Sequence, residues 1–347
     1  MRDKYRYDEV FEAALEAFRE NFALPGNFVI NVVEEYFDPN LRIDKVLQIT
    51  AYDKRFNFCV EIKNNITMAL IGLLKQHKER LPYPLLLATN HATDYIADQL
   101  KQNNIEFIDT AGNAYINQPP VFIFVKGNRP PDIFRQVPQK QAFKPTGLKV
   151  IFAFLCNLEL VNKTYRDIAT VAEVALGTIG WVIRDLKEMG YLLQMGKRGY
   201  KLINKEDLLN RWVVDYPEKL RPKLILGRFR GNPGWWEQQT LNYEYAQWGG
   251  EVAALKLTRY LKPQNITIYT RQRYLNDLLL EHRLRKDING DIEILKRFWK
   301  PVTWQDYKEI VHPILIYADL MATGDQRNIE TAKVIYEQNI VRYIRED

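Results

Sequence analysis

The centre of the chain has the sequence KTYRDIATVAEVALGTIGWVIRDLKEMGYLLQMGKRGYKL, from Lys163 to Leu202. Apolar residues at helical spacing predict a short helix over 165–171 and a longer one over 175–189. Two β-prone runs on either side of a glycine-bounded turn predict a hairpin over 191–203. The inner face of the longer helix would bury Ile179, Val182, Ile183 and Leu186. This segment is therefore expected to fold as two helices followed by a hairpin.

The ends of these elements carry suitable capping residues. Thr164 can cap the first helix through its hydroxyl, and Gly190 can end the second helix. An exposed helix start followed by a cationic hairpin is typical of a winged helix-turn-helix, in which the second helix enters the major groove and the hairpin holds phosphates. The residues expected to face DNA are Leu176, Gly177, Thr178, Trp181 and Arg184 on the helix, with Lys197 and Arg198 on the hairpin.

The same elements can also serve as a protein-interaction module or only as core, so the charge distribution matters. Residues 144–205 hold ten Lys and Arg against five Asp and Glu, a net of +5. Residues 1–130 hold fifteen against seventeen, a net of −2. Positive charge concentrated on one segment favours a phosphate-binding surface. One departure is Ala175, which stands where such a helix often begins with Ser or Thr.

The whole chain has 347 residues, a net charge of +6 and 46% hydrophobic residues, which predicts an ordered protein of two or three domains. Its two cysteines and four histidines show no metal-ligand spacing, so neither a disulfide framework nor a zinc site is expected. The first ten residues lack the apolar stretch of a signal peptide, and no apolar run is long enough to cross a bilayer. A cytoplasmic protein without membrane contact is therefore expected.

Residues 1–130 alternate between helical and β-prone patterns. The expected order is a helix at 5–22, three strands ending at 63, and a helix at 66–81. A strand, a helix and a further strand follow, ending at Asp109. This order predicts an α/β layered domain. Gly112 is expected to turn the chain between two short strands, and 121–126 is expected to be an edge strand.

Within this order, Asp44 enters the second strand, and Glu61-Ile62-Lys63 ends the third. An aspartate followed by a hairpin and Glu-x-Lys resembles the restriction-endonuclease-like fold. Alternate residues share a face of a strand, so Glu61 and Lys63 would project together beside Asp44. The resemblance implies that Asp44 and Glu61 could bind Mg²⁺ and that Lys63 could activate water. A structural charge network at the end of the sheet is the alternative interpretation.

The remainder of the chain divides at a proline-rich stretch. Residues 131–143 are expected to be a linker into the winged helix at 144–205, and 206–347 to form a second α/β or α+β domain. No nucleophile, zinc-protease or P-loop motif occurs there. Asp319, Asp325 and Arg327 are expected to form a structural polar cluster. The predicted fold class is a multidomain α/β and α+β protein.

Four segments together resemble the AbiEi-type antitoxins of bacterial type IV toxin–antitoxin systems. They are IEFIDTAGNAYI at 105–116, the predicted winged helix at 163–202, GGEVAALKLTRYLKP at 249–263 and HPILIYADLMATGDQRNIETA at 312–332. The chain is similar to the branch with a restriction-endonuclease-like N-terminal part. The resemblance implies a transcriptional regulator without a cofactor, which represses its own operon and counteracts a nucleotidyltransferase toxin without a stable complex.

Two functions therefore remain open on the sequence. In the first, a non-enzymatic regulator binds double-stranded operator DNA through the winged helix, and the flanking domains position it and provide surfaces for a homodimer. In the second, a Mg²⁺-dependent endonuclease uses Asp44, Glu61 and Lys63 and is targeted by the winged helix. Convergence of the Asp44 and Glu61 carboxylates on one face of the sheet is a requirement of the second function.

Overall fold

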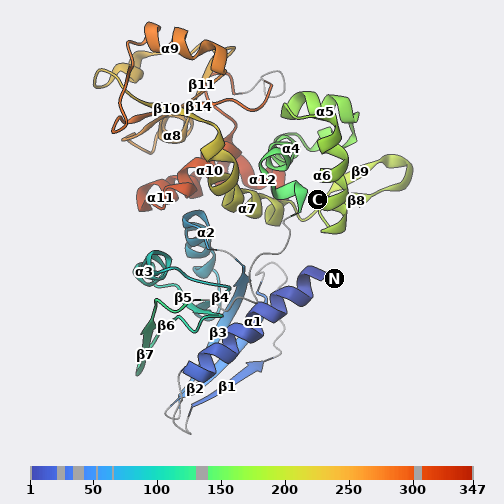
Figure 1. Cartoon of the computed structure of the whole chain (residues 1–347), viewed down its shortest axis with the longest axis vertical. Helices are drawn as coiled ribbons and strands as arrows, with labels where there is room; N and C mark the ends of the chain where they lie inside the picture. The colour runs from blue at the N-terminus through green and yellow to red at the C-terminus, as the bar shows by residue number, and fades with distance from the viewer. Residues whose placement is uncertain are drawn as a thin grey trace. The chain divides into compact units, whose positions relative to one another are not determined.

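The computed structural model describes residues 2–21, 28–33, 43–51, 54–64, 66–129, 140–300 and 307–345. The chain forms two compact units, Met1–Val137 (unit 1) and Pro138–Asp347 (unit 2). Both units combine helices with β-sheet, so the protein is a mixed α/β molecule (Figure 1). None of the described helices has the length and apolar character needed to cross a membrane. Residues 131–139 of the expected linker lie outside the described residues.

Unit 1 is built on a seven-stranded sheet whose strands follow one another in chain order. The sheet is parallel from β3 to β5 and antiparallel elsewhere. The predicted order of helices and strands is present. The elements are α1 (Arg2–Asn21), β1 (Phe28–Val33), β2 (Lys45–Ala51), β3 (Lys54–Lys63), α2 (Met68–Lys78), β4 (Leu85–Thr89), α3 (Asp94–Gln102), β5 (Glu106–Asp109), β6 (Ala114–Gln118) and β7 (Val121–Val125).

Helix α1 covers one face of this sheet (Figure 1). Its apolar stripe packs on side chains that alternate along the strands, such as Phe58, Val60 and Ile62 of β3. The intervening side chains of β3 point to the other face, where His77 of α2 contacts Glu61 and where α3 packs on β5, β6 and α2. The stripe predicted for α1 is confirmed, because all its members are buried: Val10, Phe11, Ala14, Leu15 and Phe18.

The turn between β5 and β6 is organised by Asp109, which is fully buried. Its carboxylate accepts hydrogen bonds from the backbone N–H groups of Ala92, Ala111 and Asn113 and from the Asn113 amide. Gly112 has φ +78°, a conformation that favours glycine. The predicted turn at Gly112 is therefore confirmed, and Asp109 joins it to the loop after β4.

Unit 2 begins with a helical part that carries a two-stranded hairpin, and continues into a five-stranded sheet. Its first elements are α4 (Pro145–Cys156), α5 (Tyr165–Ala172), α6 (Leu176–Glu188), β8 (Leu192–Gln194), β9 (Tyr200–Leu202) and α7 (Lys205–Asp215). The later elements are β10 (Ile225–Arg230), β11 (Ala246–Gly249), α8 (Gly250–Thr258), β12 (Ile266–Thr270), α9 (Leu275–Glu281), β13 (Arg285–Lys286), β14 (Ile292–Lys296), α10 (Pro313–Ala322), α11 (Gln326–Ile335), a π-helical turn (Tyr336–Ile340) and α12 (Val341–Arg345).

The larger sheet has the strand order β11-β12-β14-β10-β13. Strands β12 and β14 are parallel, and the other pairs are antiparallel. Helices α8, α10 and α11 pack against one another beside it. Because α10 has buried residues all round, it forms the centre of this layer.

An aromatic core joins the helical part of unit 2 to the part that contains the sheet. Phe152 of α4 stacks on Trp212 of α7, with ring centroids 5.3 Å apart, and also contacts Trp299 at 5.7 Å. The Trp212 indole N–H donates to the Leu148 carbonyl at 2.8 Å. Residues on both sides of the expected boundary at 205–206 thus lie in one compact unit. The division of this unit into a winged helix at 144–205 and a second domain at 206–347 stays a prediction.

Candidate nucleic-acid interface

The two helices and the hairpin expected between Lys163 and Leu202 are present as α5, α6 and the strands β8 and β9. The Thr164 hydroxyl accepts a hydrogen bond from the Asp167 N–H at 3.2 Å and caps α5. Gly190 has φ +76° just after α6. Ala175 makes no side-chain cap bond, as the sequence indicates. All four predicted core positions of α6 are buried: Ile179, Val182, Ile183 and Leu186.

The opposite side of α6 is open to solvent. Leu176 and Trp181 are each 52% exposed, and a Cβ added at Gly177 would meet no atom within 4 Å. The Arg184 guanidinium lies 4.1 Å from the centre of the Trp181 ring, and its Nε is 3.9 Å from a Glu188 carboxylate oxygen. The structure thus places these members of the predicted set on one exposed helix face.

The remaining members of the predicted set are less exposed or lie on the hairpin. Thr178 is half-buried at the start of α6. Arg198 is exposed in the short 3-10 turn Gly196–Arg198, which joins β8 to β9. Lys197 belongs to the same turn, but its side chain lies outside the described part of the structure. The structure therefore brings the helix residues together and places Arg198 on a separate element.

Two contacts that the sequence analysis missed position this hairpin. The Asn162 side chain accepts from the Tyr200 N–H at 2.7 Å and donates to the Tyr200 carbonyl at 2.9 Å. The Lys187 ammonium donates to the Tyr200 hydroxyl at 2.7 Å and lies 4.3 Å from the centre of its ring. The hairpin is thus tied both to the segment before α5 and to α6. Nothing in the local sequence indicates the Asn162 contact, because 38 residues separate the partners.

The turn between α5 and α6 is also held from a distance. Glu173 caps α5 with φ +50°, and its carboxylate accepts from the Arg271 guanidinium at 3.0 Å. The Lys300 N–H donates to the Val171 carbonyl at 3.2 Å. Residues from the part of unit 2 that contains the sheet therefore fix the angle at which α6 begins.

The three residues of the possible nuclease site lie at one end of unit 1. The strand register pairs Val46 with Cys59, so Asp44 and Glu61 extend the same row on the face covered by α2. The Asp44 carboxylate accepts the Ile62 N–H at 2.8 Å. The Lys63 ammonium lies 3.3 Å from a Glu61 carboxylate oxygen. Asp44, Glu61 and Lys63 are thus neighbours, with both acids on one face of the sheet.

Glu61 has a further partner that the sequence analysis did not find. Its other carboxylate oxygen contacts Nδ1 of His77, near the end of α2. Burial raises the pKa of Glu61, but Lys63 and His77 outweigh this effect and lower it below its ordinary value. The sequence indicates this contact only weakly, because His77 reaches Glu61 only when α2 packs on β3. Among the described residues, no group of three or more His, Cys, Asp and Glu could hold a metal ion.

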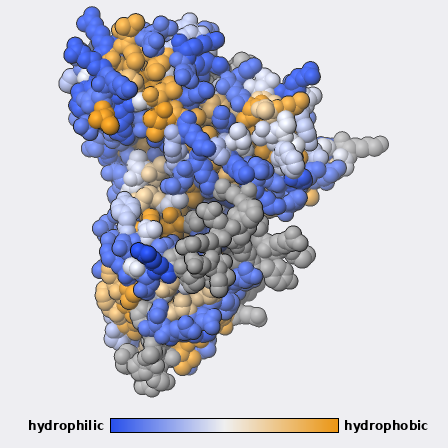
Figure 2. All heavy atoms as spheres, viewed as in Figure 1, coloured by the Kyte–Doolittle hydropathy of each residue, from blue (hydrophilic) through white to orange (hydrophobic). Residues whose placement is uncertain are grey.

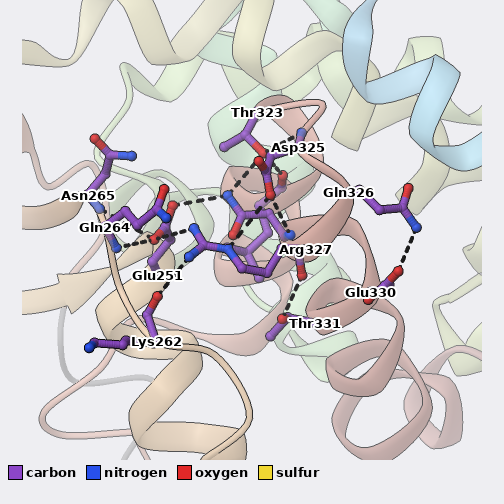
Figure 3. A network of polar contacts seen from close by, with 12 residues as sticks. Glu251, Lys262, Gln264, Asn265, Thr323, Asp325, Gln326, Arg327, Glu330 and Thr331 are labelled. Carbon is purple, nitrogen blue, oxygen red and sulfur yellow. Dashed lines mark hydrogen bonds and ion pairs between the residues drawn. The ribbon is translucent and has the colours of Figure 1, made fainter. Parts of the chain in front are cut away.

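The last part of unit 2 has a polar network of its own, centred on Glu251 of α8 (Figure 3). Glu251 is buried, and its carboxylate accepts from the Gln264 N–H at 2.6 Å, the Asn328 amide at 3.1 Å and the Arg327 guanidinium at 3.2 Å. Arg327 also donates to the Lys262 carbonyl at 3.0 Å. This network joins α8 to α11 and the loop before β12.

Asp319 does not share these contacts. It is buried in α10, where it accepts from the Tyr269 hydroxyl at 2.9 Å, the Tyr216 hydroxyl at 3.2 Å and the Arg221 guanidinium at 3.1 Å. Asp325 instead caps α11 through the Asn328 N–H. The expected cluster is therefore confirmed only for Asp325 and Arg327, whose carboxylate oxygen and Nε lie 3.8 Å apart. Asp319 does not belong to it, because the preceding helix carries Asp319 into a different network.

In a comparison with protein families, a family model matches residues 201–341. The family is described as "Transcriptional regulator, AbiEi antitoxin, Type IV TA system". Residues 201–341 are therefore a domain of the AbiEi antitoxin and transcriptional regulator family. No curated protein and no solved structure matches the chain. Of the segments that carry the resemblance, 249–263 and 312–332 lie inside the match, 105–116 lies before it, and 163–202 only touches its start.

Proposed function

We propose that this protein is a DNA-binding transcriptional regulator of the AbiEi type and that residues 144–205 are its winged helix-turn-helix. The observation that carries the proposal is the exposed face of α6. It presents Leu176, Trp181 and Arg184 to solvent from a helix whose other side is buried. This helix lies in a segment of net charge +5, and the match to the antitoxin family begins after it, at residue 201.

The chemistry of this face suits a major groove. A guanidinium is the side-chain group that most often reads guanine, and an aromatic ring can contact the thymine methyl group. Because α6 has no side-chain cap, its first N–H groups are suited to a phosphate. Arg198 and Lys197 of the hairpin bind flanking phosphates in this proposal. In this proposal the regulator represses its own operon and counteracts a nucleotidyltransferase toxin without a stable complex.

The test is the binding of the purified protein to its own upstream DNA, measured by fluorescence anisotropy with unrelated DNA as competitor. We expect Arg184→Ala to weaken specific binding by about 1–3 kcal/mol and to leave non-specific binding nearly unchanged. Arg342→Ala is the matched control, because Arg342 also lies over an exposed ring, 4.7 Å from the centre of Tyr343, in α12. Equal affinity of the Arg184 variant and the control would count against the proposal.

The endonuclease alternative requires Mg²⁺ at Asp44 and Glu61, and their present contacts do not fit this ion. One Glu61 oxygen already pairs with Lys63 and the other contacts His77, and one Asp44 oxygen accepts a backbone N–H. Mg²⁺ demands near-octahedral oxygen ligands, which these contacts oppose. We therefore propose that Asp44, Glu61, Lys63 and His77 form a charge network that fixes the end of the sheet. Cleavage in the binding assay with Mg²⁺ or Mn²⁺ that is lost in Lys63→Ala would show instead that the protein is a nuclease.

A further inference from the structure

The strand β7 lies at the edge of the sheet of unit 1 and has the sequence VFIFV. Only β6 pairs with it among the described strands. An edge strand presents a row of N–H and C=O groups that can pair with a strand of another chain. Natural edge strands usually carry a charge or a proline that prevents this pairing, but β7 has neither within its five residues.

The side chains of β7 are apolar on both faces. On the face of α3, Phe122 is 61% exposed, and the Lys101 ammonium lies 4.1 Å from the centre of the Phe124 ring. On the other face, Val121 and Ile123 belong to the core under α1. Figure 2 shows apolar side chains gathered at the lower left, along this edge of unit 1. A partner strand would therefore bury apolar surface on both faces.

The sequence of β7 identifies the partner, because VFIFV is the same in both directions. In an antiparallel pair of two such strands centred on Ile123, Val121 lies opposite Val125, and Phe122 lies opposite Phe124. Aromatic side chains then meet aromatic side chains on the α3 face, and aliphatic ones meet on the α1 face. Like residues facing one another about a two-fold axis are the requirement of an interface between identical chains.

The charges of α3 are arranged unevenly along β7. Asp98 of α3 pairs with Lys126, just after β7, at 2.6 Å, whereas Lys101 lies over Phe124. Helix α3 thus runs antiparallel to β7, with its acids Asp94 and Asp98 first and Lys101 last. A two-fold axis that reverses β7 also reverses α3. The two Lys101 residues then lie nearest the axis, because each ammonium is close to the Phe122 and Phe124 rings that flank Ile123, whereas the acids lie at the outer ends. This approach of like charges weakens the pairing.

We propose that β7 is the dimer interface of this protein and pairs antiparallel with β7 of a second copy about a two-fold axis at Ile123. The interface does not depend on the DNA-binding proposal, since every residue that forms it lies in unit 1. Pairing of five residues, with α3 beside it, places the contact at the small end of specific interfaces. The dimer should therefore be reversible and depend on protein concentration.

The first test is sedimentation velocity of the full chain over a wide range of concentrations. We expect a shift from monomer to dimer, and a dissociation constant raised about tenfold or more in Phe122→Lys. The new ammonium would face an apolar ring and lie near Lys101, whereas the exposure of Phe122 leaves the monomer fold intact. Tyr260→Lys is the matched control, because Tyr260 is 60% exposed but lies in unit 2. A chain that stays monomeric throughout would overturn the proposal.

The second test measures the register by oxidation of single cysteine variants. At the axis, two copies of Ile123→Cys have Cα atoms about 4.5–5.5 Å apart, within disulfide range. Two copies of Val125→Cys would be separated by four residues, about 13 Å. We expect rapid cross-linking of Ile123→Cys, slow cross-linking of Val125→Cys, and restored cross-linking in the double variant Val121→Cys/Val125→Cys. The wild-type chain shows how much cross-linking arises from its own cysteines, Cys59 and Cys156. Equal rates for the two single variants would overturn the register.

Discussion

His312, the residue before α10, shows how one partly buried side chain makes stability depend on pH. Burial lowers the pKa of His312 to about 3, and its Nδ1 accepts the Ile314 N–H at 3.3 Å as the N-cap of α10. A proton on Nδ1 would remove this acceptor and place positive charge at a helix N-terminus, which is unfavourable. The folded protein therefore keeps His312 neutral at pH values where the unfolded chain binds a proton.

This difference predicts a loss of stability in weak acid. The unfolded histidine has a pKa of about 6.5, so the free energy of unfolding should fall from about pH 6.5 towards pH 3. By pH 5 the loss reaches about 2 kcal/mol. His312→Asn keeps a capping oxygen but does not titrate, so its stability should change less between pH 7 and 5. Urea unfolding of both proteins at the two pH values measures this, and parallel losses would contradict the prediction.

A second prediction at this scale concerns the buried Glu251. Removing one partner of a buried ion pair typically costs about 3–5 kcal/mol, whereas an exposed pair contributes about 0–1 kcal/mol. Glu251→Ala would leave the Arg327 guanidinium and the Gln264 N–H without their acceptor. We expect a loss of about 3 kcal/mol in urea unfolding. Glu309→Ala, which removes the exposed pair with Lys256, is the control and should cost less than about 1 kcal/mol.

At the scale of elements, a helix or strand was predictable from the sequence where a local pattern of residues defines it. Helical spacing with Thr164 and Gly190 at the ends was enough to locate α5 and α6. Strand β11 has no local pattern of its own, because only its pairing with β12 and the bridge from Trp248 to Ile310 define it. Likewise, no local pattern indicates the π-helical turn at Tyr336–Ile340 that separates α11 from α12.

The candidate site follows the same rule. The exposed face of α6 was predictable, since side chains opposite a buried stripe must face solvent. The partners that hold the site were not, because Asn162 and Arg271 act across 38 and 98 residues. His77 and Glu61 are 16 residues apart, and only the packing of α2 on the sheet brings them into contact.

The Asn162 contact leads to a prediction for the hairpin as an element. Asn162→Ala removes two hydrogen bonds to Tyr200, which fix β9 beside the segment before α5. We expect faster amide hydrogen exchange at residues 192–202 and a modest loss of DNA affinity, with α6 unchanged. Asn289→Ala, at an exposed turn of unit 2, is a control that should alter neither. Unchanged exchange in the hairpin would show that Asn162 does not hold it.

At the scale of the whole molecule, charge is distributed unevenly. The net of +5 on residues 144–205 contrasts with −2 on residues 1–130. If the basic segment binds phosphates, the logarithm of DNA affinity should fall linearly with the logarithm of salt concentration. We expect Lys197→Ala and Arg198→Ala each to reduce this slope by about 0.9 and to weaken all DNA sequences similarly. A slope equal to that of wild type in both variants would exclude the hairpin from the interface.

The buried contact of Tyr216, Tyr269 and Asp319 makes the unfolding of unit 2 visible in the absorbance of these two tyrosines. The two hydroxyls lie 2.5 Å apart and share one carboxylate, so burial and Asp319 raise the pKa of both tyrosines well above the usual value. Folding of unit 2 therefore opposes the ionisation of both, whereas tyrosines freed by unfolding ionise near pH 10. In an alkaline titration followed at the tyrosinate absorbance band, these two rings would add no absorbance until the surrounding core unfolds. Their late, simultaneous step in absorbance would then record the loss of that core in a protein that carries no added label.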